Sequence, residues 1–105
     1  MEIIEAVGRN GQMSFNGRVL TITREGALAR ASQGRNRKDI PLSQISGVQL
    51  KPNTLLAAGY LAITLPGAAE QNRQGNPATD ENTVVFGKKA QPEFERLRDA
   101  ILAAL

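Results

Sequence analysis

The chain has 105 residues, of which 41% are hydrophobic, and its 13 basic and 10 acidic residues give a net charge of +3. This size suits one domain, and no apolar run approaches the roughly 20 residues that a membrane-spanning helix needs. The sequence has no histidine and no cysteine, which excludes disulfides, thiol nucleophiles and the commonest general base. It also has no Gly-rich phosphate loop and no metal-ligand spacing, so we expect no enzyme, no metal and no cofactor.

Two Asn-Gly pairs, at 10–11 and 16–17, lie near the start of the chain. Both residue types tolerate positive φ, so each pair predicts a tight turn, with a short strand over 12–16 between them. Residues 18–24 are rich in β-branched side chains and follow a two-residue period, which predicts a strand with Leu20 and Ile22 on one face. Acidic residues near the N-terminus stand where a secretory signal is basic, so we expect a cytoplasmic protein.

The middle of the chain predicts more short strands separated by breaks. Pro41 cannot donate a ladder hydrogen bond, so 39–42 should be an edge strand or a strand start. Alternation and flanking turn residues predict further strands over 27–31, 45–51, 59–65 and 82–86. The stretch 67–81 is rich in Gly, Ala, Gln, Asn and charge, which predicts a flexible loop.

Residues 92–105 predict a helix that ends the domain. Pro92 fits the first helical position, and Glu93 and Glu95 lie where the helix dipole favours negative charge. One apolar stripe runs along it at helical spacing: Phe94, Leu97, Ile101 and Leu105. Each such side chain contributes roughly 1.5–3 kcal/mol when buried, so we expect the stripe to pack on the chain's own sheet. The sequence thus predicts one mostly β domain over 1–105, an antiparallel two-sheet barrel or sandwich capped by the helix.

Several strings of the sequence resemble bacterial pleckstrin-homology-like (PH-like) domains of unassigned function from actinobacteria, other Gram-positive bacteria and phages. The similar strings are Gly8–Gly11, Ile22–Gly26, Ile40–Pro52, Gly59–Leu61, Val84–Lys89 and Glu93–Arg98. The resemblance implies a seven-stranded two-sheet barrel with a closing helix, and an ability to form homo-oligomers. Many such domains precede a short helical SHOCT segment, which we do not expect here. Lipid binding does not follow from the resemblance, because Arg9 stands nearly alone in the first hairpin and the helix lacks the tryptophan of eukaryotic relatives.

Two surfaces are candidate binding sites. The basic run Arg30, Arg35, Arg37 and Lys38 lies on or beside a loop and could bind a phosphate, a nucleic acid or an anionic lipid; otherwise it is a solvated hairpin. Leu55 and Leu56, with Tyr60 nearby, could form an apolar knob for a partner, or could fold into the core. Lys88 and Lys89 are expected to form a solvated turn.

These surfaces suggest two functions. We expect a non-catalytic protein-interaction or self-assembly module, whose partner is another protein or a second copy of the chain. The alternative is a module that binds an anion through the Arg30–Lys38 run, in which case binding should weaken steeply as salt rises.

Overall fold

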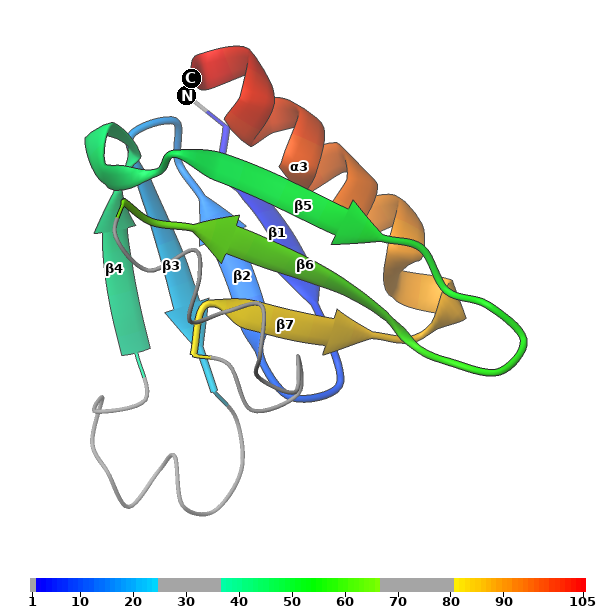
Figure 1. The fold of residues 1–105 in the computed structure, drawn as a ribbon. Coiled ribbons are helices and arrows are strands. Elements are labelled where there is room, and N and C mark those ends of the chain that lie inside the picture. Colours follow the sequence, from blue (N-terminus) through cyan, green and yellow to red (C-terminus); the bar gives the residue numbers. More distant parts are fainter. Residues whose placement is uncertain (1, 25–36, 67–80) are drawn as a thin grey trace.

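The computed structural model describes residues 2–24, 37–66 and 81–105. Within these ranges the chain forms seven strands and one α-helix (Figure 1). The strands are β1 (Ile4–Val7), β2 (Gln12–Phe15), β3 (Val19–Thr23), β4 (Arg37–Pro41), β5 (Gly47–Lys51), β6 (Gly59–Thr64) and β7 (Thr83–Phe86). The helices are the 3₁₀ turns η1 (Leu42–Gln44) and η2 (Lys88–Ala90) and the α-helix α3 (Gln91–Ala104). The strand expected at 27–31 and nearly all of the loop expected at 67–81 lie outside the described residues.

The strands form two antiparallel sheets that follow the chain order. The first sheet has the order β1-β2-β3-β4 and the second sheet the order β5-β6-β7. In the described part no strand of one sheet pairs with a strand of the other, so the sheets face each other without closing into a barrel. β4 is an edge strand, which is one of the two possibilities predicted for 39–42, and Pro41 is its last residue.

Both Asn-Gly pairs form the turns expected of them. Gly8 N donates to Gly11 O at 2.8 Å and closes the turn between β1 and β2. In the next turn Asn16 Oδ1 accepts from the backbone of Arg18 and Val19, and Gly17 has a φ of 95°. A side chain is strained at that φ, so glycine fits this position.

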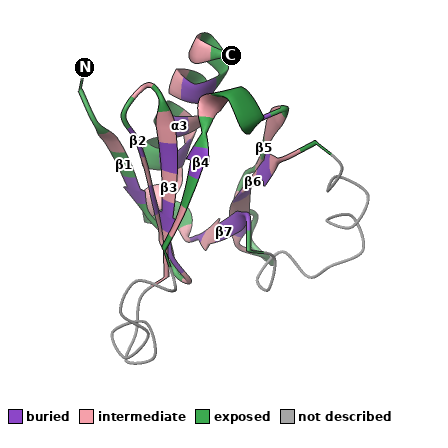
Figure 2. Cartoon of the chain, turned by 90° about the vertical axis from the view of Figure 1, so that its left-hand side faces the viewer, coloured by how far each residue is buried: buried purple, intermediate pink, exposed green. Residues whose placement is uncertain are grey.

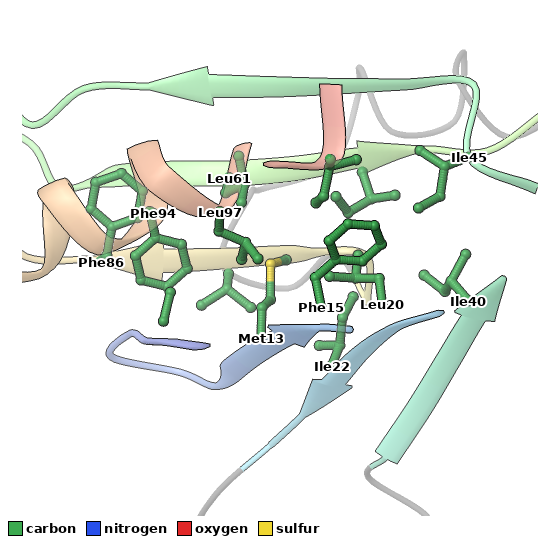
Figure 3. Packing of buried hydrophobic residues seen from close by; sticks show 14 residues of the cluster. Met13, Phe15, Leu20, Ile22, Ile40, Ile45, Leu61, Phe86, Phe94 and Leu97 are labelled. Carbon is green, nitrogen blue, oxygen red and sulfur yellow. The ribbon is translucent and has the colours of Figure 1, made fainter. Parts of the chain in front are cut away.

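The core lies between the facing surfaces of the two sheets. Alternate residues of β3 and β6 point inward, and Figure 2 shows buried segments interrupted by exposed ones along the strands. Figure 3 shows side chains from both sheets and from α3 meeting in one cluster. Its largest fully buried members include Met13, Phe15, Leu20, Ile22, Leu61, Ile63, Phe86 and Phe94.

Helix α3 covers the side of the molecule where β1 and β5, the edges of the two sheets, lie open to each other. Phe94, Leu97 and Ile101 are fully buried, and the Phe94 ring stacks on Phe86 with centroids 4.6 Å apart. The expected burial of Leu105 is wrong, because this residue is 53% exposed. Leu105 continues the spacing of the stripe, but it follows Ala104, the last residue of α3, and the end of this helix lies beyond the strands (Figure 1).

The first hairpin also joins the second sheet directly. Arg9 N donates to Val85 O at 2.7 Å, and Val85 N donates to Asn10 Oδ1 at 2.8 Å. From the end of β3, Arg24 Nη2 donates to the carbonyl oxygens of Glu81 and Thr83, each at 3.0 Å. These contacts satisfy backbone groups along the outer edge of β7.

Among the described helices, none has the length and apolarity to span a bilayer.

Candidate functional site

The loop between β5 and β6, residues 52–58, exposes two adjacent leucines. The side chains of Leu55 and Leu56 have relative exposures of 103% and 98%. Of the two arrangements that the sequence left open, the structure therefore shows the exposed knob. In Figure 1 this loop projects past the start of α3 and away from both sheets.

Hydrogen bonds to α3 hold the base of the loop. Asn53 donates from its backbone N and its Nδ2 to Gln91 Oε1, at 2.8 and 3.1 Å. Gln91 Nε2 in turn donates to Glu95 Oε2 at 3.2 Å. Asn53 Oδ1 accepts from Gly59 N at 3.0 Å, so one side chain links both ends of the loop and the helix.

A second set of bonds shapes the tip. Thr54 Oγ1 accepts from Leu56 N at 3.3 Å and from Ala57 N at 3.0 Å, and Thr54 N donates to Ala57 O at 2.9 Å. A hydroxyl that bonds the backbone two and three residues later forms a local turn. The two leucines therefore extend from a defined backbone.

Two hollows flank the knob. We call the first the apolar hollow: it measures about 500 Å³ and lies between Asn53, Thr54 and Leu55 on the loop and Lys88, Gln91 and Pro92 at the helix start. The second, the basic hollow, measures about 290 Å³ and lies between residues 53–58, Arg9 and Lys88. The hollows share Asn53, Thr54, Leu55 and Lys88, so they adjoin along the loop.

The basic hollow brings together two cations that are far apart in the sequence. Arg9 comes from the first hairpin turn and Lys88 from η2, and both side chains are exposed. No carboxylate of the described residues forms an ion pair with either of them. Two nearby acids of α3 bond elsewhere: Glu93 accepts from Val7 N at 3.4 Å and Glu95 from Gln91.

A family profile with the description "Domain of unknown function (DUF4429)" matches residues 13–102, which is most of the chain. The chain belongs to the DUF4429 family. The matched range of this DUF4429 domain includes the knob, Lys88 and Gln91, whereas Arg9 and β1 precede it. Comparisons with the curated proteins and with the solved structures found no match.

Half of the expected basic run lies within the described part of the DUF4429 domain. Arg37 Nε pairs with Asp39 Oδ1 at 3.2 Å, and Lys38 Nζ pairs with Glu81 Oε1 at 3.0 Å and donates to Asn82 Oδ1 at 2.8 Å. As neighbours on β4, Arg37 and Lys38 point to opposite sides of the sheet. Arg30 and Arg35 lie outside the described residues.

Asp39 is also bound by a hydroxyl. The Thr21 hydroxyl donates to Asp39 Oδ1 at 2.8 Å and, together with Arg37, lowers the pKa of this carboxyl below its ordinary value of 3.8. The carboxylate is therefore ionised at neutral pH and offsets charge on β4 of the DUF4429 domain.

Tyr60 is close to the knob in sequence but not part of either hollow. It is half-buried on the outer face of the second sheet, opposite Lys51 and Val85, with Lys51 Nζ 6.0 Å from its ring centroid.

Sequence interpretation missed Arg9 and Lys88 as site residues, because only the fold brings the first hairpin, η2 and the loop together. Within the described residues no three acidic side chains gather as a metal site requires.

Proposed function

We propose that this DUF4429 domain is a non-catalytic module that binds another protein through the knob formed by Leu55 and Leu56. The supporting observation is the full exposure of two adjacent leucines on a loop that hydrogen bonds tie to α3. Burial of each leucine in a partner would contribute roughly 1.5–3 kcal/mol. Single exposed apolar residues are normal, whereas an adjacent pair on a projecting tip fits an apolar pocket of a partner.

The hydrogen bonds at the loop base favour binding in a second way. Association costs about 0.5–1.5 kcal/mol for each side chain that must be ordered, and loop ordering adds to that cost. Here Asn53, Thr54 and Gln91 already fix the backbone that carries both leucines. Binding would therefore order side chains rather than a whole segment.

The charges around the knob favour a different protein over a second copy of the chain. A two-fold dimer through the knob would bring the same surface of each copy together. Arg9 and Lys88 of one copy would then approach Arg9 and Lys88 of the other, and like charges across an interface oppose association.

Kinship with bacterial PH-like domains is part of the proposal. Two antiparallel sheets in chain order, followed by a helix that closes one side, support it. A sequence profile built from homologues of this chain should align with the profiles of bacterial PH-like domains, and profiles that do not align would contradict this kinship. We also propose a cytoplasmic location, which the absence of cysteine supports and which cell fractionation would test.

Peptide selection on the purified domain tests the docking proposal. A random-peptide phage library is selected on the wild type, and enriched peptides are titrated against the double variant Leu55→Ser, Leu56→Ser. The matched control is Ile3→Ser, Leu102→Ser, which removes two exposed apolar side chains elsewhere, at 58% and 48% exposure. We expect the knob variant to bind at least about tenfold more weakly, from the lost leucine burial, with its unfolding midpoint and the control's affinity unchanged.

Two results would contradict the proposal. One is a library that yields no binder, or that yields binders whose affinity for the knob variant equals their affinity for the wild type. The other is a wild type that forms dimers in sedimentation experiments and loses them in the knob variant, which would make a second copy the partner.

A further inference from the structure

We propose that the partner contributes an acidic segment, and that one of its carboxylates binds between Arg9 and Lys88 in the basic hollow while a neighbouring apolar side chain packs on Leu55. This inference rests on the proposed function and names the chemistry of its partner. Two observations support it. The knob adjoins the basic hollow, and the two cations that line this hollow form no ion pair with a carboxylate of the described residues.

The shape of the site suits a side chain that enters it. The basic hollow, at about 290 Å³, is bounded by the first hairpin turn, by η2 and by the β5–β6 loop. The apolar hollow, of about 500 Å³, adjoins it at Leu55 and Lys88. A short peptide with an acidic and an apolar residue side by side could occupy both hollows at once.

The backbone places Arg9 for this role. Arg9 N donates to Val85 O at 2.7 Å, which fixes the turn against β7. The guanidinium lies beside Gly87, where an added Cβ would be 3.3 Å from Arg9 Nε. A guanidinium packed on a glycine loses less freedom when a carboxylate binds, and two of its five N–H donors can bind both oxygens of one carboxylate.

A protein segment fits these features better than a lipid surface. A bilayer is flat and would touch the projecting leucines, while Arg9 and Lys88 line a hollow behind them. Two leucine side chains also carry fewer carbons than one myristoyl chain, which by itself gives only marginal membrane binding of about 10⁴ M⁻¹. The same cations complement the negative charge of an acidic peptide.

Charge reversal tests the inference. Peptides selected on the wild type are titrated against Arg9→Glu, Lys88→Glu, with Arg18→Glu, Arg96→Glu as the control that reverses two exposed cations elsewhere. We expect the selected peptides to be rich in Asp and Glu. The hollow variant should bind them at least about tenfold more weakly, the control should bind like the wild type, and Arg9→Lys should retain most of the affinity.

A second measurement separates charge from shape. The tightest peptide is resynthesised with Asn and Gln in place of Asp and Glu, and both forms are titrated at low and high salt. The acidic form should bind more tightly at low salt and lose its advantage as salt rises. If the selected peptides need the knob but show no acidic excess and bind the hollow variant normally, the inference fails and the docking proposal stands.

Vesicles provide the remaining comparison. Phosphatidylcholine vesicles with and without phosphatidylserine are sedimented with the wild type and the two variants. We expect no retention of the wild type on either vesicle. Retention on the phosphatidylserine vesicles that both the knob and the hollow variants abolish would assign the site to a lipid surface and overturn the inference.

Discussion

Gly59 opens β6 where the second sheet leaves no room for a side chain. A Cβ at this position would lie 2.5 Å from Lys51 O and 2.7 Å from Phe86 Cε1. Gly47, which opens β5, is the matched comparison, since the nearest atom to its Cβ would be Thr64 Cβ at 3.7 Å. The two glycines have the same place in their strands and very different surroundings.

We therefore expect Gly59→Ala to lower the free energy of unfolding by about 1–3 kcal/mol, the usual cost of overpacking. Gly47→Ala should leave it unchanged or raise it slightly, because alanine restricts the unfolded chain. Urea titrations of both variants measure the difference. Equal stability of the two variants would show that β6 adjusts to the extra methyl group.

Asp39 offers a pH-dependent prediction at the same scale. Its pKa is lowered first by the Thr21 hydroxyl and then by Arg37, so the folded state favours the ionised carboxyl. A lowered pKa stabilises the fold above the ordinary value of 3.8, and this contribution is lost as pH falls through the folded pKa. We expect Thr21→Val to raise the pKa of Asp39 towards 3.8, as NMR titration of the carboxyl can measure. An unchanged pKa in this variant would leave Arg37 as the main cause.

The packing of the two sheets on each other depends on helix α3. Ile101 is fully buried, whereas Leu105, which the sequence placed on the same stripe, is about half exposed beyond the last turn. We expect Ile101→Ala to lower the free energy of unfolding by about 2–5 kcal/mol and Leu105→Ala to change it by under about 0.5 kcal/mol. Urea denaturation of both variants decides this. A comparable loss for Leu105→Ala would mean that something covers the end of the helix in solution.

The sequence predicted elements well where a local pattern carried the information. Alternation placed Leu20 and Ile22 in the core, Asn-Gly pairs marked both early turns, and Pro41 marked an edge. Patterns could not place Leu105, because helical spacing gives a direction but not the point where the sheets end.

The candidate site was also predictable only in part, because a local sequence pattern is visible before the fold is known and a contact between distant residues is not. Leu55 and Leu56 were visible as an apolar pair, but only the fold shows that they point into solvent. Arg9 and Lys88 meet through tertiary structure, so no local pattern could pair them. Arg37 and Lys38 looked like one basic surface, yet their alternation along β4 separates them.

At the scale of the whole molecule, Asn10 links the first hairpin to the second sheet. Its Oδ1 accepts from Val85 N at 2.8 Å on the edge of β7. We expect Asn10→Ala to lower the free energy of unfolding by about 1–3 kcal/mol, since a part-buried N–H loses an acceptor. Asn10→Asp keeps an oxygen acceptor and should cost less. If the aspartate variant is as unstable as the alanine variant by thermal denaturation, the amide's other contacts matter more than this bond.

The chain-order arrangement of the strands has a consequence for how the molecule folds. Within the ranges that the structure describes, each sheet pairs strands that follow one another, so its hydrogen bonds can form without waiting for distant segments. The contacts of α3 with β1 join opposite ends of the described chain and carry the largest loop-closure cost. We expect this step to come last, so that Leu97→Ala speeds unfolding and leaves the refolding rate nearly unchanged in stopped-flow measurements. A refolding rate that fell with stability would instead place the helix in the folding nucleus.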